Sequence, residues 1–220
     1  MDESIGSMQM PDVLYHGSPA AFRTFDLSKA YPLKDYGRGF YLTSCLEQAV
    51  SWANKKRRKA ACGYVYEYQV VSWENIREIL HIKEFLKYDL EWAVFVARHR
   101  CMELLDNFDL VYNRMADSAS EKIERASQKY LMKGNYKNQK HLLRILSRQK
   151  EGYDQYCFKT DCSHQYLVCK RVAVVSGSVE EPVITWQEAK DFYKQHGLRK
   201  KIAVISGNRI TWEEVWDFDE

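Results

Sequence analysis

The chain has 220 residues, of which 45% are hydrophobic and 14% are aromatic. This length predicts one domain of ordinary size, or one domain with a small appendage, and the presence of only 10 Gly and 4 Pro excludes a collagen-like or low-complexity chain. A formal net charge of +3 is too small to indicate a nucleic-acid-binding protein by itself.

Cysteine usage and hydropathy limit the chain further. The six Cys residues are scattered and form no CxxC pair, so neither a zinc site nor another metal site is predicted. No apolar stretch reaches the roughly 20 residues that span a bilayer, and the acidic N-terminus does not resemble a signal peptide. We therefore expect a cytoplasmic protein, or one delivered to the cytosol of a host or target cell. Residues 1–11 are expected to be disordered or to derive from cloning.

Apolar periodicity and turn residues predict the elements in chain order. Strands are expected at residues 12–16, 39–43, 64–71, 108–112, 156–160 and 170–175. A first helix is expected to begin at Ser44, whose spacing to Glu47 is that of a capping box. Further helices are expected at residues 89–98 and in two segments of 118–150 that are separated at Gly134. A short helix is expected from Ser163. Residues 20–36 are predicted to form a loop, whereas the pattern at 76–86 is ambiguous.

The C-terminal segment contains an internal repeat. Residues 172–177 and 184–189 recur in similar form at 202–207 and 210–215. Each copy is predicted to form a strand, a turn and a helix capped by Thr185 or Thr211, because a Glu follows three residues later. We therefore expect a main domain at 12–171 and a β/α appendage with an internal duplication at 172–220, whose function the sequence does not indicate.

The segment Tyr15-His16-Gly17-Ser18 places polar groups directly after an apolar strand. An imidazole offers one donor and one acceptor, so it can orient a ribose hydroxyl. Gly17 allows a ligand to lie against the backbone, whose N–H and C=O can pair with a planar amide, and Ser18 can add a hydroxyl contact. By itself, however, this segment is more typical of an ordinary turn that contains a histidine.

A second segment, Gly37-Arg38-Gly39-Phe40-Tyr41, combines two glycines with an aromatic pair. Side chains alternate across a strand, so one ring of the pair is expected to face the core and the other to face a ligand. Tyr41 is the ring that would stack on nicotinamide. The alternative is a glycine bulge that packs both rings, and Arg38 could reach either phosphate or solvent.

The order of these segments resembles the H–Y branch of the ADP-ribosyltransferase superfamily, which includes poly(ADP-ribose) polymerases and diphtheria toxin. The chain is most similar to a bacterial family of small ADP-ribosyltransferase-like proteins of unknown function. That family also has a Trp-x-x-Phe helix with a following Arg, a strand ending in Ala-Asp, and a late strand of the form Asp-Gln-x-x-Phe-x-Thr. The matching residues are Trp92, Phe95, Arg98 and Arg100, then 108–111 with Ala116 and Asp117, then 154–160.

The resemblance implies an α+β fold, with a split core of two small antiparallel sheets, flanking helices and an NAD cleft. It implies that His16 binds the nicotinamide ribose, that the Gly17 backbone binds the carboxamide, and that Tyr41 stacks on nicotinamide. The full implied NAD-binding set is His16, Gly17, Ser18, Gly39, Phe40, Tyr41 and Arg100. Arg100 could pair with the pyrophosphate, but a structural salt bridge is the more common role for such a residue.

The third catalytic position of the superfamily, usually Glu, falls on Gln155. Cleavage of the nicotinamide–ribose bond builds positive charge on the ribose carbon, which a carboxylate stabilises. A neutral amide can hydrogen-bond the ribose but cannot act as a base, so single transfer is favoured over chain elongation. Asp154 is the alternative acid or base, although strand alternation directs it away from the face that Gln155 uses.

Several neighbouring residues have plainer predicted roles. Asp35 is expected to shape the loop before the first glycine, and Asp117 to cap the helix that follows it. The remaining histidines, including His99, show no ligand-like spacing and are expected to be ordinary surface or half-buried residues.

The expected activity is therefore NAD-dependent mono-ADP-ribosylation of a protein or nucleic-acid acceptor, with NAD as substrate and no metal. The alternatives are NAD glycohydrolysis, RNA 2′-phosphate removal, and a non-catalytic module that binds NAD or ADP-ribose. Fold analogy does not decide among them. The acceptor and the oligomeric state are not indicated by the sequence.

Overall fold

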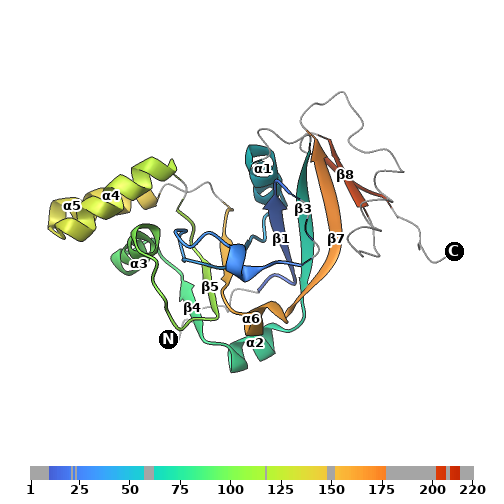
Figure 1. The fold of residues 1–220 in the computed structure, drawn as a ribbon, viewed down its shortest axis with the longest axis horizontal. Helices are drawn as coiled ribbons and strands as arrows, with labels where there is room; N and C mark the ends of the chain where they lie inside the picture. The colour runs from blue at the N-terminus through green and yellow to red at the C-terminus, as the bar shows by residue number, and fades with distance from the viewer. Residues whose placement is uncertain are drawn as a thin grey trace, which may run out of the picture.

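The computed structural model describes residues 10–20, 22, 24–56, 62–116, 118–147, 152–176, 202–206 and 209–213. Within these ranges the chain has an α+β fold with six α-helices and two β-sheets (Figure 1). This confirms the predicted α+β class. No helix in the described part of the chain is long and apolar enough to cross a membrane.

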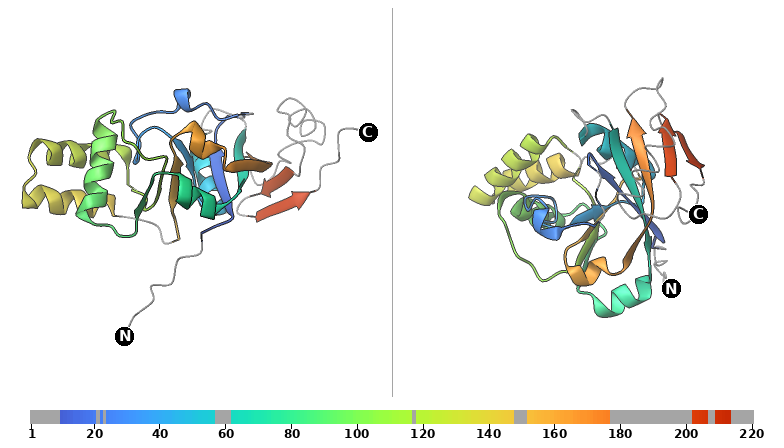
Figure 2. Two further views of the ribbon diagram at one scale, coloured as in Figure 1. Left: turned by 90° about the horizontal axis from the view of Figure 1, so that it is seen from below. Right: turned by 45° about the vertical axis from the view of Figure 1, so that its right-hand side comes forward.

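The first sheet contains five strands. In spatial order they are β1 (Val13–Ser18), β3 (Cys62–Val70), β7 (Leu167–Ser176), β8 (Ile202–Ser206) and β9 (Arg209–Glu213) (Figure 2). One face, through Tyr15, Gly17 and Val65, packs against helix α1 (Leu46–Lys56). The opposite face, through Leu14 and Tyr66, faces the interior of the molecule.

The second sheet contains four strands. In spatial order they are β2 (Phe40–Leu42), β6 (Gln155–Phe158), β5 (Leu110–Asn113) and β4 (Ile82–Phe85). Its outer face is covered by three helices: α3 (Leu90–Cys101), α4 (Ser120–Met132) and α5 (Tyr136–Leu146). Smaller elements complete the described fold: α2 (Trp73–Ile79), α6 (Asp161–His164) and a 3-10 helix at Leu27–Lys29.

Both sheets are mixed, so the prediction of two antiparallel sheets is wrong for one strand pair in each. In the second sheet β4 runs parallel to β5, and in the first sheet β7 runs parallel to β8. A parallel pair needs a crossover connection rather than a hairpin. Helix α3 provides that crossover between β4 and β5, and 25 residues separate β7 from β8.

The core between the sheets is built from alternating strand residues. Leu14 and Tyr66 from the first sheet meet Phe40 and Phe158 from the second, and each side chain is at most 2% exposed. Burial of such side chains stabilises a fold by roughly 1.5–3 kcal/mol each relative to exposure. Helix α1 packs on the face of the first sheet that points away from this core, and α3, α4 and α5 lie on the side of the second sheet that points away from the first (Figure 1).

Local sequence signals place most helix starts correctly. Asp89 caps α3 by accepting from the backbone N–H of Trp92, and Asn135 caps α5, where the break was predicted. Residues 76–86, whose pattern was ambiguous, contain the end of α2 and all of β4. The Ser44 hydroxyl, predicted to cap the first helix, donates to Asp154 across the fold.

The C-terminal segment differs from its prediction. The proposed boundary between residues 171 and 172 falls within β7, and β8 and β9 extend the first sheet. The helix predicted at 210–215 is wrong for Ile210–Glu213, because these residues form strand β9 against β8. Isoleucine, threonine and tryptophan favour strands, and pairing with β8 outweighs the local capping signal at Thr211. Residues 1–9, Asp117 and the predicted helix at 184–189 lie outside the described residues.

Candidate functional site

Strands β1 and β2 meet at a single residue pair and then separate into different sheets. Tyr15 and Thr43 exchange two backbone hydrogen bonds, with N···O distances of 2.7 and 2.9 Å. If the antiparallel pairing continued, Gly17 would lie opposite Tyr41. Instead the His16 side chain bridges the two strands, since its Nδ1 lies 2.7 Å from the carbonyl oxygen of Tyr41.

This separation leaves a backbone edge at Gly17. Strand peptides alternate in direction, so the N–H and C=O of Gly17 face the same edge as those of Tyr15, away from β3. That edge points toward the region between the two separating strands. A planar amide needs one such donor and one such acceptor, and the pair at Gly17 provides both.

The glycine at position 17 is also required by packing. An added Cβ would lie 2.1 Å from the carbonyl oxygen of Ala49 and 2.9 Å from the backbone nitrogen of Ala53, both in α1. A second glycine of the motif has a similar role, since a Cβ at Gly39 would lie 2.3 Å from Sγ of Cys157 in β6. Close packing of backbone therefore explains both glycines independently of any ligand.

His16 is a neutral ring in a defined tautomer. Its ring centroid lies 4.6 Å from that of Phe40, 5.6 Å from that of Phe22 and 6.3 Å from that of Tyr66. Exclusion of water by these surroundings lowers the pKa of His16 to about 4, against the smaller opposing effect of the hydrogen bond to Tyr41. The carbonyl can only accept, so Nδ1 carries the proton, and Nε2 keeps a lone pair that can accept a hydrogen bond.

Tyr41 anchors the glycine-containing loop through its hydroxyl group. The hydroxyl donates to the carbonyl of Gly37 at 2.7 Å and accepts from the backbone N–H of Tyr36 at 3.0 Å. Burial raises the pKa of Tyr41 well above its usual value. The side chains of Phe40 and Tyr41 lie on opposite faces of β2, as predicted, but both pack against core clusters: Phe40 lies between the sheets, and Tyr41 lies against the cluster beneath α3. Stacking of Tyr41 on nicotinamide stays a prediction.

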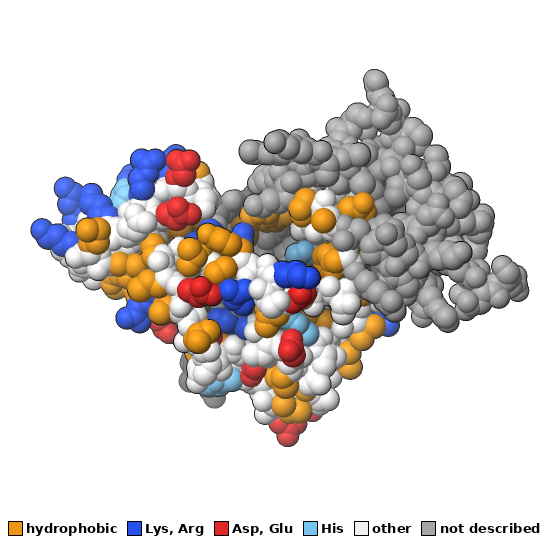
Figure 3. All heavy atoms as spheres, viewed as in Figure 1, with side chains coloured by type: hydrophobic (Ala, Val, Ile, Leu, Met, Phe, Trp, Pro, Cys, Tyr) orange, Lys and Arg blue, Asp and Glu red, His pale blue; other side chains and the backbone are white. Residues whose placement is uncertain are grey.

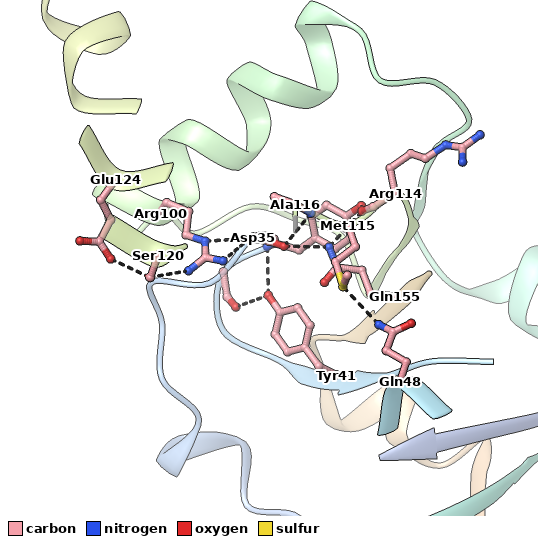
Figure 4. A network of polar contacts seen from close by, with 12 residues as sticks. Asp35, Tyr41, Gln48, Arg100, Arg114, Met115, Ala116, Ser120, Glu124 and Gln155 are labelled. Atoms are coloured by element: carbon pink, nitrogen blue, oxygen red, sulfur yellow. Dashed lines mark hydrogen bonds and ion pairs between the residues drawn. The ribbon is translucent and has the colours of Figure 1, made fainter. Parts of the chain in front are cut away.

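Gln155 lies in a buried polar network centred on Asp35 (Figure 4). Its Nε2 donates to Asp35 Oδ2 at 3.2 Å and to the carbonyl of Arg114 at 3.0 Å. These two bonds use both amide hydrogens and leave Oε1 as the acceptor for an outside group. The Arg114 carbonyl also accepts from the hydroxyl of Tyr36, and the residue before it, Asn113, has the unusual backbone φ of 99°.

The Asp35 carboxylate accepts hydrogen bonds from Arg100 on α3, from Gln155 on β6 and from the loop residue Ala116. Its Oδ1 lies 2.7 Å from Nε of Arg100 on α3, and its Oδ2 accepts from the backbone N–H of Ala116 at 3.2 Å. Asp35 is 4% exposed, so its charge depends on Arg100 for compensation. This confirms the structural salt bridge as a role of Arg100, and it shows why Asp35 shapes the loop.

Asp154 is engaged on the other side of β6. Its carboxylate accepts from the hydroxyl of Thr43 at 2.7 Å and from both the backbone and the hydroxyl of Ser44 at 2.8 and 2.5 Å. Gln48 of α1 adds a bond from its Nε2 to the Asp154 carbonyl at 2.7 Å. Asp154 and Gln155 therefore point in different directions, as strand alternation predicts, and Asp154 joins the end of β2 and the start of α1 to β6.

The remaining predicted residues have local roles. The Ser18 hydroxyl donates to the carbonyl of Ala20 at 2.7 Å within a turn. Arg38 donates to the carbonyls of Ser28 and Ala30 and forms an ion pair with Glu103 at 2.8 Å. The structure thus brings His16 and Tyr41 together and ties Tyr41 to Gln155 through the loop at residues 35–37.

One buried cluster next to this loop was not predicted. His99 is 3% exposed, and its Nε2 lies 2.8 Å from Asp106, which also pairs with Lys159. Lys159 donates to the carbonyl of Tyr36, and the His99 ring contacts Gly37. The cluster joins residues that are far apart in sequence, so no local spacing could have indicated it.

Comparison with known proteins gives a family but no characterised relative. A family model described as "Protein of unknown function (DUF3990)" matches residues 13–168, which include every residue of the candidate site. The comparison with curated proteins gave no match, and neither did the comparison with solved structures. The family match confirms the predicted membership in a family of unknown function. The relation of that family to ADP-ribosyltransferases stays a prediction. The chain belongs to the DUF3990 family.

Proposed function

We propose that this protein is an NAD-dependent mono-ADP-ribosyltransferase. The observation that carries the proposal is the separation of β1 from β2 after Tyr15 and Thr43, which leaves the Gly17 peptide edge beside a neutral His16. Nicotinamide carries a planar carboxamide, which would pair with the Gly17 backbone. A hydroxyl of the adjacent ribose would then donate to Nε2 of His16.

The reaction replaces one bond at the ribose carbon. The bond between that carbon and the nicotinamide nitrogen breaks, its electron pair leaves with nicotinamide, and a nucleophile on the acceptor forms the new bond. Positive charge develops on the ribose during this exchange. Gln155 would accept a hydroxyl hydrogen of the ribose at Oε1, which places a partial negative charge near the developing cation.

The same network explains why we favour single transfer. Gln155 has no ionisable group, and the neighbouring carboxylates of Asp35 and Asp154 already accept several hydrogen bonds each. Neither carboxylate is placed to activate a second ribose for chain growth. Because these carboxylates are already hydrogen-bonded, the network also supports the alternative of a non-catalytic NAD-binding module. Glycohydrolysis differs from the main proposal only in that water is the acceptor.

The test is incubation of the full chain with adenylate-labelled NAD and cell lysate, for wild type and for His16→Ala, Tyr41→Ala and Gln155→Ala. We expect label on a macromolecule with wild type and at least a tenfold loss with each variant, an effect of about 1.4 kcal/mol or more on the transition state. Digestion of the labelled product with protease or nuclease identifies the class of acceptor.

Two matched controls separate site effects from general damage. His81→Ala and Gln139→Ala replace the same residue types outside the site and should keep wild-type labelling. Circular dichroism checks that each variant is folded. Release of free ADP-ribose without labelling would indicate glycohydrolysis. Binding of NAD that His16→Ala abolishes, without any turnover, would contradict the transferase proposal and leave the binding module.

A further inference from the structure

The α4–α5 hairpin extends from the side of the molecule that lies away from the first sheet (Figures 1 and 2). Its apolar side chains are buried against α3, including Ile123 and Ala126 on α4 and Leu142 and Leu146 on α5. The apolar faces of both helices are thus occupied, and their outer faces determine what the hairpin presents to solvent.

Those outer faces are strongly basic. Residues 118–147 contain seven Lys and Arg and two Glu, a formal net charge of +5, whereas the whole chain carries +3. All seven cations are exposed: Lys122, Arg125, Lys129, Lys133, Lys137, Lys140 and Arg144. From Arg125 to Lys150 the sequence contains no Asp or Glu. Positive charge is therefore concentrated on this hairpin, although the net charge of the whole chain is small.

The cations form rows along the two helices. Arg125, Lys129 and Lys133 follow one another at intervals of four residues, about 6 Å along a helix axis. The two acids are confined to the first turns of α4, where Glu121 pairs with Arg125 and Glu124 accepts from Ser120. Figure 3 shows Lys and Arg side chains gathered over this end of the molecule. An extended row of cations matches a regularly charged polymer better than a small anion.

The tip of the hairpin adds an aromatic ring to this surface. Tyr136 is 70% exposed and Met132 is 87% exposed, and Nζ of Lys140 lies 5.3 Å from the centre of the Tyr136 ring. The tip is held in place because Nδ2 of Asn138 donates to the carbonyls of Lys133, at 2.6 Å, and Lys129, at 3.3 Å. An exposed ring beside cations can stack on a nucleotide base while the cations contact phosphates.

We propose that the α4–α5 hairpin binds nucleic acid, with its lysines on the phosphate backbone and Tyr136 against a base. An interfacial membrane helix would need an exposed apolar face, and here both apolar faces are buried. The hairpin contains none of His16, Tyr41 and Gln155, so the binding does not depend on the proposed reaction.

The test measures binding of labelled 20-nucleotide RNA and DNA, single-stranded and duplex, to the full chain by fluorescence anisotropy. The variant replaces Lys133, Lys137 and Lys140 with Gln. Its matched control replaces three exposed lysines elsewhere, Lys29, Lys87 and Lys170, with Gln. Both variants lose the same formal charge. Near 0.15 M salt the Debye length is about 8 Å, so distant charges contribute little.

We expect wild type to bind, the hairpin variant to bind at least tenfold more weakly, and the control to stay within about twofold of wild type. The slope of log affinity against log salt should fall by about 2 for single strands in the hairpin variant, because three phosphate contacts are lost. Tyr136→Ala should weaken single-stranded binding several-fold and duplex binding much less. Comparison of the RNA and DNA arms shows which polymer is preferred.

Three results would overturn the proposal. The first is no binding of any nucleic acid by wild type at 50 mM salt, and the second is equal weakening of binding in the hairpin variant and its control. The third is tighter binding to anionic phosphatidylserine vesicles than to either nucleic acid. All substituted side chains are exposed, so thermal unfolding of the variants should match that of wild type.

Discussion

At the scale of single residues, the candidate site depends on uncharged groups whose hydrogen-bonding roles are fixed by their neighbours. The Tyr41 carbonyl fixes the tautomer of His16, and Asp35 with the Arg114 carbonyl fixes the orientation of the Gln155 amide. Each residue thus presents one acceptor, Nε2 or Oε1, to an outside group. Two such acceptors suit a ligand with several hydroxyl groups, such as a ribose.

The lowered pKa of His16 predicts a dependence of stability on pH. Between about pH 6.5 and 4 the unfolded chain binds a proton that folded His16 does not, so stability should fall as pH falls through this window. The contribution is at most about 3 kcal/mol and is fully present above pH 6.5. His16→Gln keeps a donor for the Tyr41 carbonyl but cannot titrate in this range, so urea unfolding should show a smaller loss of stability from pH 7 to 4.

The decisive measurement is the difference in stability loss between wild type and His16→Gln. Burial also lowers the pKa of His164, which adds a loss of stability of the same sign to both proteins. His81→Gln, at an exposed position, is the matched control and should follow the wild-type curve. Parallel curves for wild type and His16→Gln would show that His16 does not titrate differently in the folded protein.

At the scale of elements, helix α1 links the two sheets. It packs on β1 through the backbone contact between Ala49 and Gly17, and its Gln48 binds the backbone of Asp154 at the start of β6. Thr43 and Ser44, which join β2 to α1, hold the Asp154 carboxylate. The position of α1 therefore determines how far apart β1 and β6 lie, and with them His16 and Gln155.

This arrangement predicts that Gly17→Ala is destabilising. The added Cβ would lie 2.1 Å from a backbone oxygen that cannot rotate away, so α1 must move from β1. Overpacking of this kind costs about 1–3 kcal/mol. Gly134→Ala is the matched control, because the nearest atom to an added Cβ there lies at 3.7 Å. Chemical denaturation should show a lower midpoint for Gly17→Ala alone, and equal midpoints for the two variants would contradict the packing argument.

At the scale of the whole molecule, the C-terminal strands β8 and β9 extend the first sheet beyond β7. Strand β8 pairs with β7 from Val172 to Val175 and covers that edge. We therefore expect the tail, residues 177–220, to protect this edge of the sheet.

A chain that ends at Ser176 should therefore self-associate, because unpaired strand edges pair with each other. Analytical ultracentrifugation over a range of concentrations measures the association. Addition of Val175→Lys to the shortened chain should reduce it, since an edge lysine opposes strand pairing. A shortened chain that does not fold, or that behaves as the full chain does at every concentration, would show that the tail has a different role.

The sequence by itself determined the elements that local pattern controls, and it placed two parts of the site. Apolar patterns predicted β1, β3 and β6, the break predicted at Gly134 lies just before α5, and Asp35 was correctly expected to shape its loop. The short helix expected from Ser163 begins two residues earlier, at Asp161. The motif residues His16 and Tyr41 were identified from their order along the chain, and the structure brings them into contact.

Tertiary structure alone decided the features that depend on distant residues. These features are the separation of β1 from β2, the parallel strand pairs and the hydrogen bond between Gln155 and Asp35. The residues involved lie far apart in the sequence: His16 and Tyr41 are 25 residues apart, and Asp35 and Gln155 are 120 residues apart. Thr211 shows the same limit, because pairing with β8 overrode a local helix signal. Periodicity and capping report what neighbouring residues favour, whereas strand pairing and buried polar networks depend on which surfaces meet in three dimensions.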